Sequence, residues 1–280
     1  MKLYSVNCGH FKLDGGAMFG VVPKSIWNKL NPADENNMCS WAMRCLLVET
    51  EGRLILIDNG MGYKQNEKFF SFYYLHGNDT LERSLKAHGF GFNDITDVFL
   101  THLHFDHCGG SVKYTDASRT KLEPVFKNAR YWSNSRHWEW AVNPNAREKA
   151  SFLKENILPI KESGQLNFID KEGEWLPGFE TLIVNGHTEG MMLPLISYKG
   201  KKILFCADLL PSFAHIPMPY IMGYDVRPLE TLKEKEKILP RAVAEKWLLF
   251  FEHDPKNECC SLQNTERGIR ESSFLRIAEL

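Results

Sequence analysis

The stretch Thr101-His102-Leu103-His104-Phe105-Asp106-His107-Cys108-Gly109-Gly110 gathers three histidines and one aspartate within six positions, directly after a short apolar segment that predicts a buried strand. Because alternate side chains of an extended chain share a face, His102, His104 and Asp106 should point the same way. A helix should begin near His107, so its side chain would point to a position beside the one that His102, His104 and Asp106 face. Adjacent but divergent ligands of this kind are typical of two metal ions a few ångströms apart.

The donor types narrow the chemistry of such a site. Imidazole and carboxylate together suit zinc, manganese or iron. The seven cysteines are scattered and form no Cys-x-x-Cys pair, which argues against a closed structural zinc site, a redox dithiol and a dense disulfide framework. A surface histidine cluster without a metal is the alternative, and four potential ligands at this spacing disfavour it.

Three later apolar strands are each followed by a further potential ligand. These ligands are His187 in Asn185-Gly186-His187-Thr188, Asp208 in Cys206-Ala207-Asp208, and His253 in Phe251-Glu252-His253-Asp254. Sites in α/β-type proteins collect at strand ends on one edge of a sheet. We therefore predict one site that draws its ligands from both halves of the chain.

The length of 280 residues corresponds to roughly two domains at about 150 residues each. No low-complexity linker separates the halves, however, and the ligand order spans both, so we predict one domain over residues 1–280. We expect a hairpin around Glu51-Gly52 and a short strand at Asp97 to Leu100. A helix should begin near Pro228 and end or kink at Pro240.

Charge and hydropathy exclude several classes of partner. The 34 basic and 35 acidic side chains leave a net charge of −1, which argues against a general nucleic-acid binder. No segment reaches the 18 or so consecutive apolar residues that a membrane span needs. The first ten residues also lack an apolar stretch of secretory type. We expect a soluble, cytoplasmic protein.

The residues quoted above resemble the metallo-β-lactamase superfamily, whose motif reads His-x-His-x-Asp-His, then Gly-His-Thr, a strand-end Asp and a late His. The similarity extends from the early hairpin ending in Leu56-Ile57-Asp58-Asn59-Gly60 to His253. It implies an α/β (α+β) fold, the αβ/βα four-layer sandwich of that type, with two mixed β-sheets face to face and flanked by helices.

The resemblance also implies a set of metal ligands. It assigns His102, His104 and His187 to a first divalent ion and Asp106, His107 and His253 to a second, with Asp208 bridging both. Zinc is the first expectation for both ions, with manganese, cobalt or iron as alternatives. Asp58 would orient the ligand loop through hydrogen bonds, although a strand-ending aspartate can also simply close a turn.

Within the superfamily, the chain is most similar to the N-acyl-homoserine lactonases and the methyl parathion hydrolase-like enzymes. The supporting segments are the motif itself, Leu13-Asp14-Gly15-Gly16-Ala17-Met18-Phe19-Gly20 and Ile221-Met222-Gly223-Tyr224-Asp225. This similarity implies a hydrolase in which a metal-bridging hydroxide opens a lactone ring. Asp106 would hold the water and pass its proton to the leaving oxygen. A phosphotriesterase or arylesterase that attacks a small ester is the alternative.

The same similarity predicts a substrate pocket, with two departures from the family pattern. Met18, Phe19 and Trp27 would face an acyl chain, unless the Gly-rich stretch is only a turn before a packed strand. The family tyrosine three positions after Asp208 is Pro211 here, so Tyr220 or the metals alone would support the carbonyl oxygen. A second histidine that follows Gly-His-Thr-x-Gly in the family is Met191.

Two other superfamily activities fit the sequence less well. A glyoxalase-type thioesterase should present basic residues for glutathione, and none are recognisable. A nuclease is disfavoured by the balanced charge.

The aromatic segment Lys68 to Tyr74 belongs to the core, to a pocket mouth or to a subunit contact, and the last of these would make the protein a homodimer.

Overall fold

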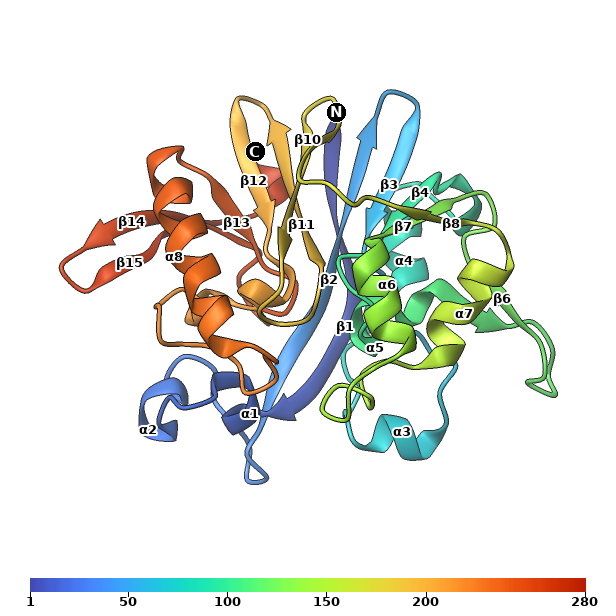
Figure 1. The fold of residues 1–280 in the computed structure, drawn as a ribbon, viewed down its shortest axis with the longest axis horizontal. Coiled ribbons are helices and arrows are strands. Elements are labelled where there is room, and N and C mark those ends of the chain that lie inside the picture. The colour runs from blue at the N-terminus through green and yellow to red at the C-terminus, as the bar shows by residue number, and fades with distance from the viewer. The chain divides into compact units, whose positions relative to one another are not determined.

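The computed structural model describes residues 1–280, which form two compact units (Figure 1). The first unit comprises residues 1–9 and 43–171, and the second comprises residues 10–42 and 172–280. The division falls inside two long strands, β1 (Lys2–Asp14) and β2 (Met38–Thr50), so each of these strands contributes residues to both units.

The sheet of the first unit has the strand order β1-β2-β3-β4-β7-β8. Its remaining strands are β3 (Arg53–Ile57), β4 (Asp97–Phe99), β7 (Arg130–Ser133) and β8 (Leu166–Phe168). Strands β2 and β3 pair antiparallel, whereas β3, β4, β7 and β8 run parallel to one another. The sheet is therefore mixed. A separate antiparallel pair consists of β5 (Val112–Tyr114) and β6 (Leu122–Pro124).

The helices of the first unit follow strands or connect them. They are α3 (Glu67–Ser71), α4 (Leu81–Ala87), α5 (Phe105–Cys108), α6 (Ser135–Val142) and α7 (Lys154–Glu162), with 3-10 turns at Phe92–Asp94 and Gly109–Ser111. Helix α4 begins where the Thr80 hydroxyl accepts a hydrogen bond from Arg83 N at 3.2 Å. Helix α6 begins in the same way, because Asn134 accepts from the amides of Arg136 and His137.

The second unit contains a seven-stranded mixed sheet with the order β15-β14-β13-β12-β11-β10-β9. These strands are β9 (Gly173–Leu176), β10 (Phe179–Val184), β11 (Met191–Tyr198), β12 (Lys201–Phe205), β13 (Leu248–Phe250), β14 (Cys259–Thr265) and β15 (Gly268–Leu275). Only β12 and β13 pair in parallel. The other neighbours pair antiparallel.

The helices of the second unit are α1 (Gly15–Phe19), α2 (Lys24–Trp27) and α8 (Pro228–Ala244), with 3-10 turns at Ala207–Leu209, Phe213–His215 and Ile277–Glu279. Helix α8, drawn in orange in Figure 1, lies against β14 and β15. It buries Ile238, Leu239 and Ala242, which give it an apolar face.

Several predictions of local structure are confirmed. Two mixed sheets with flanking helices are present, as the fold class requires. The hairpin forms with Thr50 opposite Arg53, and both turn residues adopt positive φ, 47° at Glu51 and 76° at Gly52. Two positive φ values match the right-handed twist of the flanking strands. The short strand at Asp97 also forms and is fully buried.

The prediction that Pro240 ends or kinks the last long helix is wrong about its end. Helix α8 continues past Pro240 to Ala244. Leu239 and Ala242, on either side of the proline, are completely buried. Burial of these side chains offsets the missing backbone hydrogen bond, since most helix stability in proteins comes from packing.

The aromatic segment does not belong to the core. It forms α3 and the turn after it, where Phe72 is 59% exposed and Tyr74 is 53% exposed. A place at a pocket mouth or subunit contact stays a prediction.

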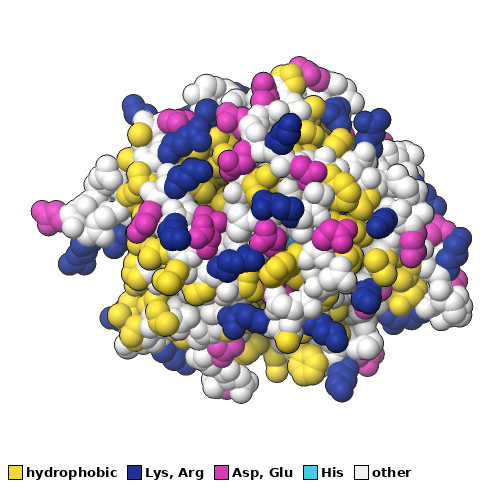
Figure 2. Space-filling model, viewed as in Figure 1, with side chains coloured by type: hydrophobic (Ala, Val, Ile, Leu, Met, Phe, Trp, Pro, Cys, Tyr) yellow, Lys and Arg dark blue, Asp and Glu magenta, His cyan; other side chains and the backbone are white.

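The surface carries both signs of charge. In the face shown in Figure 2, Lys and Arg side chains alternate with Asp and Glu side chains, as the near-zero net charge suggests. No helix combines the length and the apolar character that crossing a membrane requires.

We predict that Pro240→Ala stabilises the protein. Position 240 is exposed and lies inside α8, so alanine restores a helical hydrogen bond and removes a steric clash. The gain in the free energy of unfolding should be about 1–2 kcal/mol, because proline also restrains the unfolded chain. Urea denaturation measures it, with Lys237→Ala on the same helix as control. An unchanged or lower stability of Pro240→Ala relative to the control contradicts the prediction.

Candidate metal centre

In the first unit, polar side chains follow three neighbouring parallel strands. Asp58 follows β3, Thr101 follows β4 after one residue, and Asn134 follows β7. Because the carboxyl ends of parallel strands meet at one edge of a sheet, these residues lie together where the histidine motif begins. The motif continues from Thr101 through the loop to α5.

Asp58 connects the end of β3 to the motif. Its Oδ1 accepts from Thr101 N at 2.8 Å, and its Oδ2 accepts from Thr101 Oγ1 at 2.6 Å. The same Oδ2 lies 3.2 Å from His107 Nδ1. The residue is completely buried and holds a φ of 56°, a left-handed conformation that aspartate tolerates better than most residues. These are the contacts that an orienting residue would make, and the orienting role of Asp58 stays a prediction.

The hydrogen bonds assign the protons on two imidazole rings. The Thr101 hydroxyl donates to Asp58, so its oxygen accepts from His102 Nδ1 at 3.0 Å. His107 Nδ1 donates to the Asp58 carboxylate. Both rings therefore carry their proton on Nδ1 and their lone pair on Nε2, which is the nitrogen left for a metal ion.

The four ligand-type side chains of the first unit are buried and close to one another. The His102 ring centroid lies 4.6 Å from that of His104 and 3.9 Å from that of His107. The potential ligand atoms of His102 and His104 lie within 4.8 Å of each other, as do those of Asp106 and His107. We call these four residues the first ligand set.

Two glycines allow the motif to approach the loop after β3. Asn59 N donates to His107 O at 2.9 Å, and Gly110 N donates to Gly60 O at 2.9 Å. A Cβ atom at Gly110 would overlap Asn59 O, and one at Gly109 would overlap the backbone of Met61. The Gly109-Gly110 pair is thus required by this close contact.

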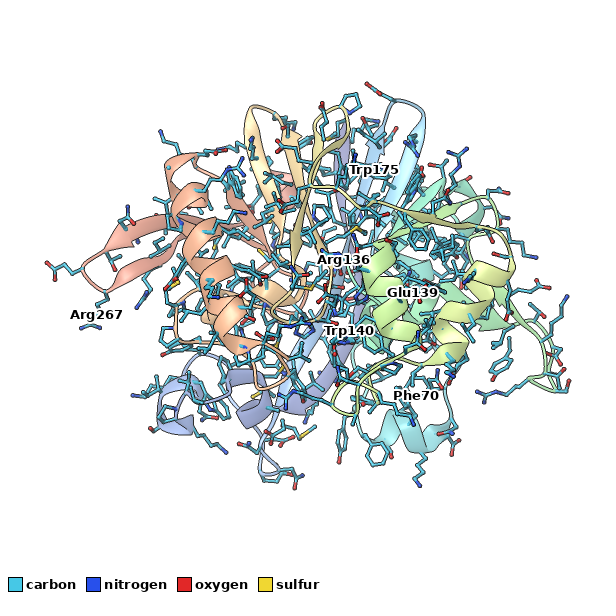
Figure 3. The ribbon with its side chains drawn as sticks, in the orientation of Figure 1. Phe70, Arg136, Glu139, Trp140, Trp175 and Arg267 are labelled. Atoms are coloured by element: carbon cyan, nitrogen blue, oxygen red, sulfur yellow. The ribbon has the colours of Figure 1, made fainter.

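Sequence reasoning missed two residues that support the first ligand set. His137 on α6 accepts a hydrogen bond from Leu103 N at 2.8 Å, which fixes the backbone between His102 and His104. The buried Glu148 places Oε1 3.6 Å from His104 Nε2, and its Oε2 accepts from Trp140 Nε1 at 2.6 Å. Trp140 projects from α6 (Figure 3). Both residues lie 30 or more positions from the motif in sequence, so no local pattern identifies them.

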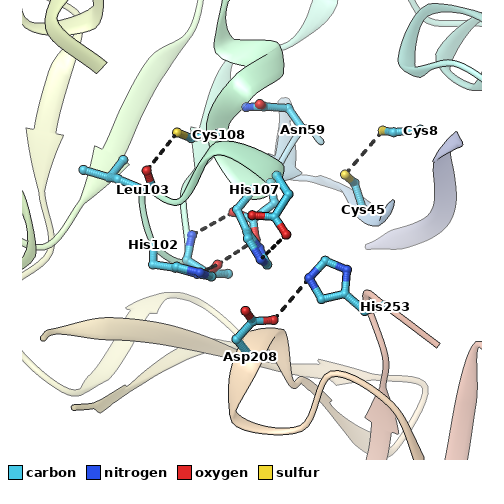
Figure 4. A network of polar contacts seen from close by, with 12 residues as sticks. Cys8, Cys45, Asn59, His102, Leu103, His107, Cys108, Asp208 and His253 are labelled. Atoms are coloured by element: carbon cyan, nitrogen blue, oxygen red, sulfur yellow. Dashed lines mark hydrogen bonds and ion pairs between the residues drawn. The ribbon is translucent and has the colours of Figure 1, made fainter. Parts of the chain in front are cut away.

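In the second unit, Asp208 lies between two imidazoles. Its Oδ2 is 3.1 Å from His187 Nε2. Its Oδ1 is 3.2 Å from His253 Nε2, and Figure 4 shows this second contact. The three residues follow β10, β12 and β13, and each is at least nine-tenths buried. We call them the second ligand set. One carboxylate oxygen facing each imidazole is the arrangement that a bridging ligand needs.

Each imidazole of the second ligand set has a hydrogen-bond partner at Nδ1, the ring nitrogen that does not face Asp208. His187 Nδ1 lies 2.9 Å from Asp225, which also accepts from the Thr231 hydroxyl at 2.7 Å. His253 Nδ1 donates to Ala42 O at 2.7 Å. A carbonyl can only accept, so this bond places the His253 lone pair on Nε2. Asp225 ends the segment Ile221-Met222-Gly223-Tyr224-Asp225, and no local sequence pattern predicts its contact with His187.

The electrostatics of the second ligand set favour positive charge. Burial lowers the pKa of His187, but the charges and hydrogen bonds of Asp208 and Asp225 more than compensate and raise it to about 10. A position at which two buried carboxylates stabilise a proton also stabilises a divalent cation in its place. The imidazole and carboxylate donors of both sets suit zinc, manganese, cobalt or iron.

The residues expected to line a substrate pocket lie in the second unit. Met18, Phe19 and Trp27 are at most 1% exposed. The rings of Phe19 and Trp27 stack at a centroid distance of 5.2 Å. Tyr220 is half-buried, and the carbonyl of Pro211 accepts from His253 N at 3.1 Å. Their contact with a substrate stays a prediction.

The seven cysteines are buried and form no disulfide, including Cys108 and Cys206 beside ligand positions. Burial raises the pKa of the Cys108 thiol to about 12, and burial also raises the pKa of the Cys206 thiol well above its usual range. A thiol of this kind is neutral at physiological pH and serves as a small packing residue.

We predict that Asp58→Asn weakens divalent metal binding. The asparagine amide would face the protons of Thr101 Oγ1 and His107 Nδ1 and disturb both. Loss of such a partner typically lowers metal affinity about 10–100-fold. Competition with a chromophoric chelator measures the affinity, with the exposed Asp79→Asn as a matched control. Equal affinity of the two variants would show that Asp58 does not orient the ligands.

Comparison with known proteins places the chain in a family. The family model for the Metallo-beta-lactamase superfamily matches residues 44–252. An N-acyl homoserine lactonase from Bacillus cereus is 28% identical over 273 residues, which cover 92% of this chain and 94% of the relative.

Solved structures agree with this match. A probable metal-dependent hydrolase from Staphylococcus aureus has a TM-score of 0.88 at 27% identity, covering 98% of this chain and 96% of that one. AidC, a dizinc quorum-quenching lactonase in complex with a product, has a TM-score of 0.77 at 24% identity, covering 98% and 95%. The family model spans three quarters of the chain and includes six of the seven ligand-type residues, all except His253. The chain therefore belongs to the metallo-β-lactamase superfamily and is one of its metal-dependent hydrolases.

Proposed function

We propose that this hydrolase opens the lactone ring of N-acyl-homoserine lactones, and so acts in quorum quenching. The observation that carries the proposal is the complete series of seven ligand-type residues in family order, each buried and held by a defined partner or neighbour. The Bacillus cereus relative, named as an N-acyl homoserine lactonase, supports this choice of substrate.

The two ligand sets are proposed to bind two divalent ions together. His102, His104 and His187 hold one ion, Asp106, His107 and His253 hold the other, and Asp208 serves both. Neither set alone supplies the three protein ligands that each of two open catalytic sites requires. Zinc is the proposed metal, because imidazole and carboxylate are its usual ligands in hydrolases.

Two such ions, when bound, polarise an ester carbonyl and make water acidic enough to act as a nucleophile at neutral pH. The chain contributes the orientation of the reactants and the transfer of the proton. Asp106 is the proposed proton carrier: its carboxylate holds the attacking water and passes the proton to the alkoxide that leaves when the ring opens. Its position at the start of α5, beside His107, suits this role.

The acyl chain of the substrate is proposed to lie against Met18, Phe19 and Trp27, with Tyr220 near the carbonyl oxygen. Support comes from the apolar composition of these side chains and from the absence of a tyrosine at position 211. A homodimer and a cytoplasmic location stay predictions.

We predict that the purified protein, loaded with zinc, manganese or cobalt, opens N-acyl-homoserine lactones. Ring opening releases one proton per turnover, and a pH indicator measures it. kcat/KM should reach at least about 10⁴ M⁻¹s⁻¹ for the best acyl chain, the lower end of ordinary enzymes.

The same panel should include phosphotriesters and aryl esters, because a metal-activated water can also attack phosphorus. A kcat/KM for a phosphotriester well above that for every lactone would overturn the proposed substrate and favour the alternative. Failure to turn over any lactone with any of the three metals would also overturn it.

We predict that His104→Ala and Asp208→Asn lower bound metal and activity together. Each substitution removes a ligand from a different unit, so a shared effect on metal content supports one joint centre. Elemental analysis of the purified variants measures metal per chain, and the exposed His76→Ala is the control. Full metal content and activity in either ligand variant would refute the assignment.

A further inference from the structure

A completely buried lysine on α8 organises an irregular segment of the second unit. Lys235 is 0% exposed, and its Nζ donates to four backbone carbonyl oxygens. These belong to His215 at 2.7 Å, Pro217 at 2.8 Å, Met218 at 3.2 Å and Tyr220 at 2.9 Å. An ammonium group has only three protons, so at least one proton is shared between two carbonyls.

A lysine is a costly choice for this position. Its neighbours on the buried face of the helix are Thr231 and the apolar Ile238, Leu239 and Ala242. An apolar residue at position 235 would extend that face, whereas burial of an ammonium needs hydrogen bonds to compensate for lost hydration. Burial lowers the pKa of Lys235 to about 7, although the negative charge of Asp225 opposes this shift. The four carbonyls provide the compensation.

The carbonyls explain why the segment needs this donor. Residues 216–223 form no helix or strand. Four carbonyls from six consecutive residues converge on one point, where no backbone amide could serve all of them. Without Nζ, the carbonyls of His215, Met218 and Tyr220 would lose this donor, whereas Pro217 O would keep its hydrogen bond from Tyr220 N at 3.0 Å. A buried carbonyl that loses its donor is unfavourable. Lys235 therefore fixes the backbone path from His215 to Tyr220.

The same segment is attached to the Gly-rich helix α1. His215 Nε2 donates to Met18 O at 2.9 Å, and its Nδ1 accepts from the Ser212 hydroxyl at 2.8 Å. Gly223 N donates to Ala17 O at 2.7 Å. The His215 ring also stacks on Phe19 at a centroid distance of 4.8 Å and an angle of 6°.

Helix α1 and residues 212–223 therefore form one connected wall, which we call the α1 wall. Met18 and Phe19 belong to α1, and Tyr220 belongs to the segment that Lys235 holds. A change at Nζ can thus reach three of the four proposed substrate contacts without touching a metal ligand.

We propose that Lys235 is a positioning residue that holds the α1 wall in shape and thereby sets which acyl chains the enzyme accepts. The substrate part of this inference rests on the proposed function. The part that concerns the backbone of residues 212–223 does not.

The first test compares Lys235→Met, which keeps the length of the side chain without its donors, with Lys237→Met. Lys237 is exposed on the same helix and serves as the matched control. Hydrogen–deuterium exchange should be at least about tenfold faster in peptides covering residues 212–224 of Lys235→Met, because the segment opens more readily. The peptides of β12 and β13 should not change. Equal exchange in the two variants overturns the proposal.

The second test measures kcat and KM for lactones with short and long acyl chains. For Lys235→Met, the KM of long-chain substrates should rise by about tenfold relative to that of short-chain substrates, as expected when an apolar contact is lost. Lys237→Met should keep the wild-type ratio. An equal loss for all chain lengths would overturn the role in selectivity.

A third variant separates a local role from a general one. Lys235→Gln retains a donor that can reach part of the carbonyl cluster, so it should restore part of the exchange protection. Global unfolding of both Lys235 variants, seen by circular dichroism, would overturn the local role. If the wild-type enzyme opens no lactone, the proposed function fails, but the exchange experiment still decides whether Lys235 holds the α1 wall.

Discussion

Buried carboxylates that face imidazole nitrogens are the interaction on which both ligand sets depend. Asp58 binds His107 directly and His102 through Thr101, while Asp225 binds His187 from behind. A neutral histidine can offer its lone pair on either nitrogen, and only a partner at one nitrogen decides which remains for a metal. These second contacts therefore select the binding atoms as well as the ring orientations.

The need to orient each imidazole also explains why the ligands lie just after strands, on loops or short helices. Each ligand follows a strand, whose backbone is regular, but lies on a loop or a short helix, where the backbone can direct the side chain differently. Buried polar groups on loops cost free energy unless each is hydrogen-bonded. Supporting elements meet this requirement: α6 supplies His137 to the first set, and α8 supports the loops of the second unit.

Helix α8 does this with consecutive residues. Glu234 accepts from the amides of Asn185 and Gly186, just before His187, and Lys235 holds the carbonyls of residues 215–220. Helix α8 thus holds the loop before His187 through the Glu234 carboxylate, which accepts hydrogen bonds. It holds residues 215–220 through the Lys235 ammonium group, which donates them. Glu234 and Lys235 lie in residues 232–237, where acidic and basic side chains alternate. Such a pattern by itself predicts a solvated helix face, yet Lys235 is completely buried.

The sequence by itself predicted the candidate ligands, because the spacing of His102 to His107 and the strand-end positions are local patterns, and it indicated the fold class through the family resemblance that these patterns carry. The β2–β3 hairpin followed for the same reason. Only the tertiary structure placed Asp225 beside His187, Glu148 beside His104, and Lys235 beside the carbonyls of residues 215–220, since each of these contacts joins residues 15 or more positions apart in sequence. The continuation of α8 past Pro240 was also a tertiary outcome, because burial on both sides of the proline outweighs its local preference.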